Sequence, residues 1–201
     1  MKQLLIATNN RGKVVEFREM LTGLDIELID LTQVEHQEVE ETGTTFAENA
    51  ELKARGYALQ TGLPAMADDS GLAIDPLDGG PGIYSARYGG EGFTFDDRMD
   101  KVLAEIDAAD TTDRRARFVC VIAVADRSGK ILHSATGICE GRIAKQAAGN
   151  GGFGYDPIFI PEGFENTFGE LSSAVKAKIS HRGRAFLQIM PFLRDFIAKS
   201  T

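Results

Sequence analysis

The sequence predicts an α/β domain built on a mixed β-sheet. Short apolar runs alternate with segments of helical periodicity in the N-terminal part, two strand-like runs flank a turn in the middle, and glycine and proline gather between these segments. With 201 residues, 43% of them hydrophobic, the chain is long enough to bury a substantial core. Because no internal repeat or low-complexity linker divides it, we expect a single domain over residues 1–201.

The N-terminal elements are predicted from periodicity. Residues 2–8 form a short apolar run typical of a buried strand, and Val14, Phe17 and Leu21 then recur at helical spacing. A second strand is expected at residues 26–31. The acidic stretch that follows shows no period, which indicates a loop.

The next helix carries its own start and stop signals. Thr45 and Glu48 have the spacing of a capping box, so the helix is expected to begin at Phe46 and run to about Leu59. Gly62 is expected to end it.

Residues 63–67 and 72–77 resemble two short strands or a hairpin around the sequence ADDSGL, and the glycine-rich residues 78–90 are expected to be loop. A helix is predicted over residues 95–106. Residues 117–125 and 130–140 flank the turn RSGK, which indicates an antiparallel hairpin.

The C-terminal part begins with the glycine-rich segment AGNGGFGYDP, which interrupts the regular structure. The sequence SSAVKAK predicts a helix after Leu171. Ser180 is expected to cap a last helix that runs to Phe196, with Pro191 either kinking or splitting it.

Charge and cysteine content exclude several classes of protein. Lys and Arg number 22 against 30 Asp and Glu, a formal net charge of −8, which disfavours general nucleic-acid binding. Any phosphate site must therefore be built locally from a few cations, backbone N–H groups or a divalent metal ion. Cys120 and Cys139 lack zinc-site spacing and are expected to be buried small hydrophobes. The N-terminal apolar run is too short for a signal peptide or a membrane span, so we expect a cytoplasmic protein.

Two segments place polar groups where strands are expected to end. In ATNNRGK, residues 7–13, helix N–H groups and Lys13 suit an anion, although an ordinary turn capped by Asn10 fits equally well and the P-loop pattern is not matched. In ADDSGL, residues 67–72, burial of the adjacent Asp68 and Asp69 would be costly without a cation, which indicates a Mg²⁺ site or a raised pKa. A solvated turn is the alternative.

Two further segments complement these. Glu38, Glu40 or Glu41 from the acidic loop is suited to complete an oxygen-rich metal site with Asp69, while Lys53 balances the charge, although most acidic loops are simply solvated. The glycine-rich GGFGYDP, residues 151–157, together with Lys176 and SHRG, residues 180–183, offers a stacking face, acceptors and donors for a heterocyclic base. The alternative is that these aromatic residues belong to the core and His181 is a surface or capping residue.

Six ordered motifs that cover nearly the whole chain resemble those of the inosine triphosphate pyrophosphatase-like family, which acts on non-standard purine nucleotides, in its bacterial dITP/XTP form. The motifs are ATNNRGK at 7–13, ETGTTFAENAELKA at 41–54, ADDSGL at 67–72, PGIYSARY at 81–88, GGFGYDP at 151–157 and SHRG at 180–183. The resemblance implies Mg²⁺-dependent hydrolysis of ITP, dITP or XTP to the monophosphate and pyrophosphate. It also implies an elongated mixed sheet flanked by helices, in two lobes with a central cleft, and a homodimer.

The resemblance also implies roles for individual residues. Asp69 would be the catalytic base and a metal ligand, Asp68 and Glu41 would complete the metal shell, and Lys53 would act near the phosphates. The remaining candidates would bind the triphosphate or the base: Thr8, Asn9, Asn10, Arg11, Gly12, Lys13, Ser70, Phe153, Gly154, Tyr155, Asp156, Lys176, His181 and Arg182. A pyrophosphatase for modified pyrimidine nucleotides and a nucleotide sensor without turnover are the alternative functions.

Overall fold

The computed structural model describes residues 2–109 and 111–199 and contains a six-stranded mixed sheet of order β2-β1-β3-β4-β5-β6 flanked by helices. β1 pairs in parallel with β2 and β3, whereas β5 and β6 are antiparallel. This confirms the predicted α/β class. The strands are β1 (Lys2–Ile6), β2 (Ile26–Asp30), β3 (Ala65–Ile74), β4 (Arg115–Ala125), β5 (Ile131–Ile143) and β6 (Phe159–Pro161).

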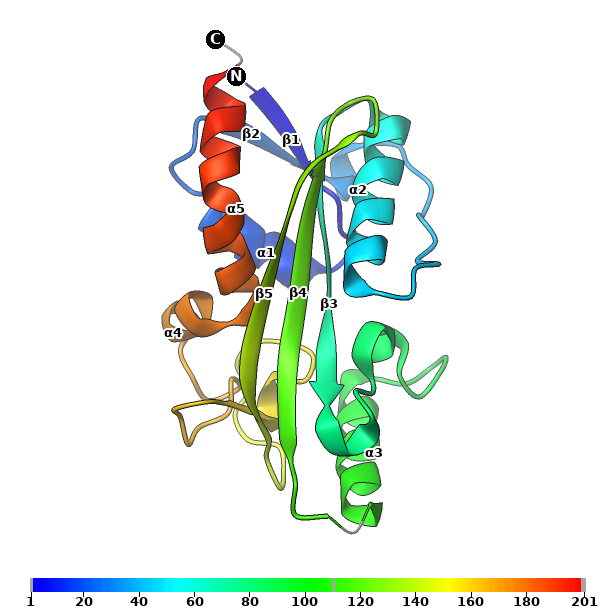
Figure 1. Ribbon diagram of the computed structural model, residues 1–201, viewed down its shortest axis with the longest axis vertical. Helices are drawn as coiled ribbons and strands as arrows, with labels where there is room; N and C mark the ends of the chain where they lie inside the picture. Colours follow the sequence, from blue (N-terminus) through cyan, green and yellow to red (C-terminus); the bar gives the residue numbers. More distant parts are fainter. Residues whose placement is uncertain (1, 110, 200–201) are drawn as a thin grey trace. The chain divides into compact units, whose positions relative to one another are not determined.

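The described residues contain five α-helices, which are labelled in Figure 1. They are α1 (Arg11–Met20), α2 (Phe46–Thr61), α3 (Phe95–Ala108), α4 (Ser173–Ile179) and α5 (His181–Ala198). Short 3₁₀ helices, which periodicity did not predict, are η1 (Leu31–Gln33), η2 (Asp75–Leu77), η3 (Gly82–Arg87) and η4 (Asp156–Ile158). Among the described residues, none of the helices has the length and apolarity needed to cross a membrane.

The predicted helix signals are confirmed. The Asn10 side chain caps α1, Thr45 and Glu48 form the capping box of α2, and Gly62 ends α2 with a φ of 65°. α5 runs without a break through Pro191, so the alternative of a split helix was wrong.

One local prediction was wrong, because residues 67–72 are neither a hairpin nor a turn between two strands. β3 continues from Ala65 to Ile74, and both Asp68 and Asp69 are buried inside it. The turn-forming preference of the Asp-Ser-Gly sequence is overridden because each carboxylate meets a cation from a neighbouring helix.

The chain divides into two compact units. The first comprises residues 1–69, 120–137 and 182–201, and the second comprises residues 70–119 and 138–181. β3, β4 and β5 therefore each contribute residues to both units.

In the first unit, alternate residues of β1 enter two different cores. Leu4 and Ile6 pack with Phe17 of α1 and with α5, whereas Leu5 packs with Ala54 of α2. The unit thus has helices on both faces of its strands.

The described residues of the second unit form a hydrophobic core. It forms where α3 packs on β4 and β5 through residues such as Val102 and Phe118, and the glycine-rich segment joins it through Tyr155. Cys139 lies in this core and Cys120 in a core of the first unit, so both cysteines are buried free thiols, as predicted.

Candidate functional site

Hydrogen bonds from its own side chains stabilise the turn between β1 and α1. The Asn10 side chain accepts a hydrogen bond from the Lys13 backbone N–H at 3.2 Å, and the Asn10 N–H donates to Thr8 Oγ1 at 3.2 Å. These bonds place Thr8, Asn10 and Lys13 around the first turn of α1, where the helix dipole favours an anion. Asn9 and Arg11 are exposed beside them and Gly12 is half-buried.

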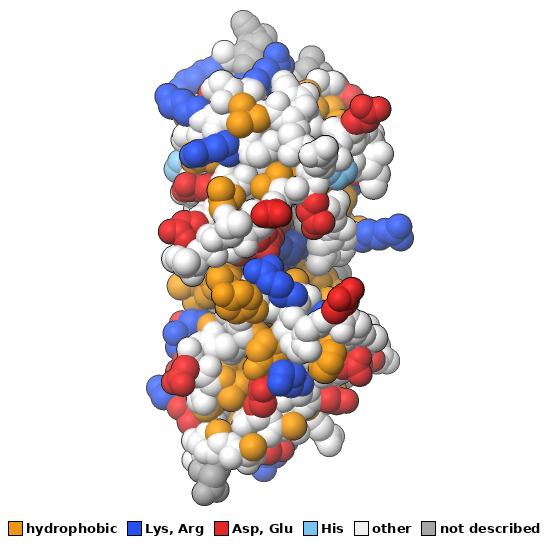
Figure 2. Space-filling model, turned by 90° about the vertical axis from the view of Figure 1, so that its right-hand side faces the viewer, with side chains coloured by type: hydrophobic (Ala, Val, Ile, Leu, Met, Phe, Trp, Pro, Cys, Tyr) orange, Lys and Arg blue, Asp and Glu red, His pale blue; other side chains and the backbone are white. Residues whose placement is uncertain are grey.

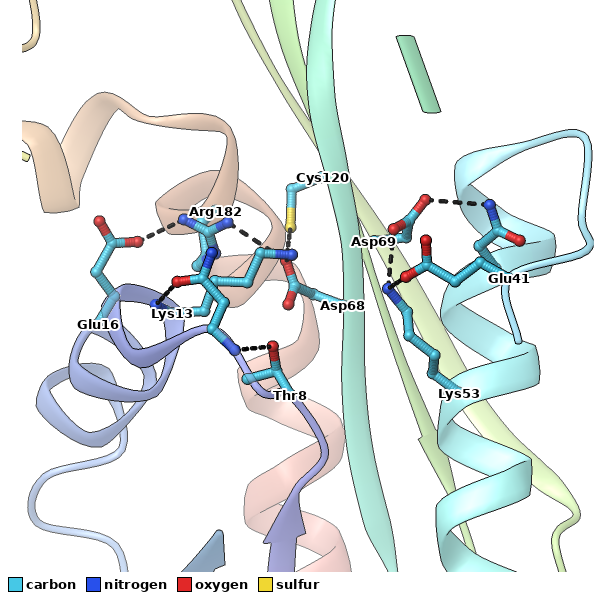
Figure 3. A network of polar contacts seen from close by, with 11 residues as sticks. Thr8, Lys13, Glu16, Glu41, Lys53, Asp68, Asp69, Cys120 and Arg182 are labelled. Atoms are coloured by element: carbon cyan, nitrogen blue, oxygen red, sulfur yellow. Dashed lines mark hydrogen bonds and ion pairs between the residues drawn. The ribbon is translucent and has the colours of Figure 1, made fainter. Parts of the chain in front are cut away.

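Asp68 lies between two cations in the interior of the first unit. Its Oδ2 is 2.9 Å from Lys13 Nζ and 3.3 Å from Arg182 NH2, and Arg182 NH1 contacts Glu16 Oε2 at 2.5 Å (Figure 3). Burial opposes ionisation of Asp68, but Lys13 and Arg182 outweigh it and hold the pKa of the carboxyl well below its usual range. Asp68 is therefore ionised at neutral pH, and Lys13 and Arg182 compensate its charge.

Asp69 belongs to a separate network. Its Oδ1 is 2.8 Å from Lys53 Nζ, which also contacts Glu41 Oε1 at 2.6 Å, and the Asn49 side chain donates to Asp69 Oδ2 at 3.5 Å. Burial raises the pKa of Asp69, and the nearby Lys53 only partly opposes this. Burial would lower the pKa of Lys53, but Asp69, Asp68 and Glu41 outweigh it and raise the pKa, so the ammonium stays charged.

The two aspartates point to opposite faces of β3, because successive side chains alternate along a strand (Figure 3). Asp68 therefore faces α1 and Asp69 faces α2, and the metal shell of Asp69, Asp68 and Glu41 stays a prediction. Among the described residues, no three acidic, His or Cys side chains gather as a metal site. Of the three predicted ligands, Glu41 and Asp69 contact the same lysine, Lys53, whereas Asp68 contacts Lys13 and Arg182.

The structure also separates the three glutamates that the sequence left as alternatives. Glu41 contacts Lys53 and is half-buried, whereas Glu38 and Glu40 are exposed. Two carboxylates with oxygen donors on a partly buried surface fit Mg²⁺, which is commonly held by one or two protein carboxylates together with substrate phosphates and water. Lys53 occupies the space between them as an internal cation.

The glycine-rich motif in the second unit is built around Asp156, which is 2% exposed. Its Oδ2 accepts hydrogen bonds from the Phe153 N–H at 2.7 Å and from Lys176 Nζ at 2.6 Å. Lys176 Nζ lies 4.6 Å from the centre of the Phe153 ring. Gly152 has a φ of 70°, and a Cβ there would lie 2.0 Å from Asp156 Oδ2, so only glycine allows this loop to close on the carboxylate.

Tyr155 is committed to the core. Its hydroxyl donates to the Ser85 carbonyl at 2.9 Å and its ring packs edge-on against Phe95, with centroids 5.7 Å apart. Burial raises the pKa of Tyr155 above its usual value. These contacts place Tyr155 in the core, and its predicted contact with the nucleotide stays a prediction. Gly154, beside it, has a φ of 65°.

His181 and Arg182 are neighbours in sequence but belong to different units. His181 stacks on Phe118 in the second unit, with centroids 4.6 Å apart and 15° between the planes, whereas Arg182 joins Asp68 and Glu16 in the first. Ser70 follows Asp69 in β3 and is half-buried in the second unit.

Sequence reasoning missed Glu16, Asn49 and Ser85. Glu16 lies one helical turn after Lys13 on α1, and Asn49 is a polar residue on the apolar face of α2, so helical spacing was the signal available for both. Ser85 lies within the motif PGIYSARY, but no role was assigned to it; its hydroxyl accepts a hydrogen bond from the Leu72 N–H at 2.9 Å.

Charged side chains of both signs are mixed with hydrophobic ones over the face shown in Figure 2. On that face the described residues form no continuous basic stripe of the kind that tracks a polyanion. This agrees with the net charge of −8.

Comparison with known proteins gives consistent matches. A model described as the Ham1 family matches residues 4–192. A relative from Oceanobacillus iheyensis named dITP/XTP pyrophosphatase is 47% identical over 195 residues, which cover 96% of this chain and 98% of that protein. One of the same name from Coxiella burnetii is 44% identical over 199 residues, 97% of this chain and 98% of that protein.

Solved structures agree with the sequence matches. A HAM1 protein from Coxiella burnetii superposes with a TM-score of 0.90 at 44% identity, covering 97% of this chain and all (100%) of that one. A nucleoside-triphosphatase / dITP/XTP pyrophosphatase from Mycobacterium abscessus superposes with a TM-score of 0.75 at 40% identity, covering 96% of this chain and 100% of that one.

Proposed function

The chain belongs to the Ham1 family, and we propose from this premise that it is a pyrophosphatase that hydrolyses the non-standard purine nucleotides ITP, dITP and XTP. The family resemblance predicted from the six motifs is thereby confirmed. The reaction gives the nucleoside monophosphate and pyrophosphate, and it would remove damaged purines from the nucleotide pool. The observation that carries the assignment is a buried carboxylate with a raised pKa beside a charged lysine and a second acid, in a chain of this family.

Asp69 is the base in the proposed mechanism. A base works best when its pKa approaches the working pH, and burial moves the pKa of Asp69 in that direction. The carboxylate would accept a proton from the water that attacks phosphorus. Lys53, whose Nζ lies 2.8 Å from Asp69 Oδ1, would stabilise the negative charge of Asp69 and orient its carboxylate.

Glu41 and Asp69 would hold Mg²⁺. When bound, the ion would neutralise negative charge that develops on the phosphate oxygens. The requirement for Mg²⁺ is part of the proposal. It is supported by the paired oxygen donors of Glu41 and Asp69 within reach of the same lysine ammonium.

The turn before α1 would bind phosphate oxygens. Its backbone N–H groups, Thr8, Asn10 and Lys13 supply donors and positive charge at a helix start, with Asn9, Arg11 and Gly12 lining the same turn. In a chain of net charge −8, this local positive end is what makes a triphosphate tolerable.

The second unit would recognise the base. Phe153 offers a ring for stacking, and Lys176 and His181 are donors for the 6-oxo group of hypoxanthine or xanthine. Adenine carries an amino donor at that position, so one buried donor would lose its partner at a cost of about 1 to 3 kcal/mol. We propose that Arg182 acts here only indirectly, since its guanidinium already contacts Asp68 and Glu16.

Product identification with a nucleotide panel tests the proposed function. With Mg²⁺, the chain should convert ITP, dITP and XTP to monophosphate and pyrophosphate much faster than ATP. Release of orthophosphate alone would contradict cleavage between the α and β phosphates. Preference for modified pyrimidine nucleotides would favour the alternative pyrophosphatase, and thermal stabilisation by nucleotide without turnover would favour a sensor.

We also propose a homodimer and a cytoplasmic location, as the family resemblance suggests. Light scattering of the purified protein tests the first. Fractionation of cells that produce the protein, with the pyrophosphatase activity as marker, tests the second.

A further inference from the structure

The segment that carries Glu41 lies alongside α2 in the first unit (Figure 1). Contacts join the two at four successive levels, which we call the rungs. The rungs pair Gln37 with Gln60, Val39 with Gly56, Glu41 with Lys53, and Gly43 with Asn49.

The spacing of the rungs follows from backbone geometry. The segment residues alternate, as they do along an extended chain, at about 6 to 7 Å per two residues. The helix residues are separated by four, three and four positions, which keeps them on one face at about 5 Å per step. Numbers rise along the segment as they fall along α2, so the two run in opposite directions. Val39, Glu41 and Gly43 face the helix and are partly buried, which explains why Glu38 and Glu40 are exposed and Glu41 meets Lys53.

Gly56 allows the segment to approach α2 closely. A glycine inside a helix is less favourable than alanine by about 1 kcal/mol, so its presence there needs a reason. A Cβ at Gly56 would lie 2.7 Å from Val39 Cγ2, closer than carbon atoms can pack, and 3.1 Å from Val39 Cγ1, a tight contact. The missing side chain makes the notch that receives Val39.

Asn49 fixes the other end of the segment and is 0% exposed. Its Oδ1 accepts the Gly43 N–H at 2.8 Å, and its amide nitrogen donates to Asp69 Oδ2 at 3.5 Å. A Cβ at Gly43 would lie 2.7 Å from Asn49 Oδ1, so this rung also requires glycine. One side-chain amide thus connects the segment to the carboxylate of Asp69.

We propose that the rungs on either side set the position of the Glu41 carboxylate, and that Gly56 and Asn49 are positioning residues of the acid site. Val39 and Gly43 flank Glu41 at equal distances along the chain, so fixing both leaves the backbone between them little freedom. The inference rests on the proposed function in one respect, the binding of Mg²⁺ by Glu41 and Asp69.

The test compares Gly56→Ala, Val39→Ala and the double variant, with Arg55→Ala at an exposed position of α2 as the control. Amide hydrogen exchange over residues 37–43 reports the segment itself, and the Mg²⁺ concentration for half-maximal ITP hydrolysis reports the acid site. Gly56→Ala should raise both the exchange rate and that Mg²⁺ concentration about tenfold, while the KM for ITP at saturating Mg²⁺ stays within about twofold. In the double variant the new methyl group fills the space left by Val39, so both values should return to within about twofold of the wild type.

Two results would overturn the proposal. One is an unchanged Mg²⁺ requirement in Gly56→Ala despite faster exchange, which would make the rungs merely structural. The other is failure of the double variant to restore both values. If Gly56→Ala does not fold, Val39→Ala decides, because it only removes two methyl groups and should raise both values about threefold. A wild-type protein that hydrolyses ITP without Mg²⁺ would refute the proposed metal role. In that case the amide hydrogen exchange of the double variant would still test whether the rungs fix the segment.

Discussion

Replacing Asp68 and Asp69 separately by asparagine should have opposite consequences, although the residues are adjacent and the substitutions identical. Asp68→Asn should destabilise the protein, and Asp69→Asn should abolish turnover while preserving the fold. The prediction follows from the two networks, since Asp68 compensates Lys13 and Arg182 and Asp69 contacts Lys53.

The magnitudes come from burial and from the direction of each pKa. The Asp68 side chain is 0% exposed and its pKa is lowered, so the charged form stabilises the folded state. Removing one partner of such a buried ion pair costs about 3 to 5 kcal/mol, or a fall in Tm of about 6 to 20 °C in a chain of this size. The pKa of Asp69 is raised, so at neutral pH its ionised form opposes folding, and the neutral asparagine should cost nothing in stability. Loss of a general base should lower kcat about 100- to 10,000-fold.

Thermal unfolding and ITP turnover of the two variants, measured at pH 7 on the same preparations, provide the assay. Turnover is expressed per folded molecule at a temperature below both transitions. The reasoning would be refuted if Asp68→Asn kept the wild-type Tm while losing activity, or if Asp69→Asn turned over ITP at near the wild-type rate. Either result would mean that the catalytic and structural acids have been exchanged.

Three other predictions concern separate features. The Tm difference between wild type and Asp68→Asn should be full above about pH 5 and shrink as the pH falls below about 4. The reason is that the folded pKa of Asp68 is lowered, so its stabilising contribution is complete above the unfolded pKa and is lost as the pH falls from there toward the folded pKa. A pH-independent difference in thermal scans would contradict this prediction. Thr45→Ala should lower the free energy of unfolding, measured by urea denaturation, by about 1 kcal/mol, because the N-cap of α2 is lost. An unchanged denaturation midpoint would mean that Glu48 alone is enough to cap the helix. Phe153→Leu should raise the KM for ITP about tenfold with kcat nearly constant, because base stacking is lost; an unchanged KM would remove Phe153 from the base site.

The helices could be predicted well because their signals are local. The capping box at Thr45 and Glu48 and the glycine at position 62 lie within one element, and the structure has both as expected. The strand through Asp68 and Asp69 could not be predicted in this way. Its stability depends on Lys13, Lys53 and other cations that are distant in sequence, and local turn preference pointed to the wrong structure.

The candidate site was predictable in its composition but less so in its connections. The motifs identified Asp69, Lys53 and the acidic loop, and the structure brings Glu41 to the same lysine. Which of Glu38, Glu40 and Glu41 contacts Lys53 depends on which residues of the segment face α2. The notch at Gly56, which receives Val39, sets that orientation, and composition does not reveal it. The motif that contains Arg182 suggested one binding surface, but the side chain turns instead to an acid far away in sequence.

Because side chains alternate along β3, the position of each aspartate in the strand decides which lysine it contacts. If β3 slipped by one residue against its neighbours, Asp69 would take the place beside Lys13, and Ser70 would face Lys53. The acid that we propose as the base would then pair with Lys13 instead of Lys53, without any change in the amino-acid sequence. The parallel pairing of Leu5 with Ala65 and of Ile6 with Met66, just before the two acids, therefore fixes which aspartate meets Lys13 and which meets Lys53.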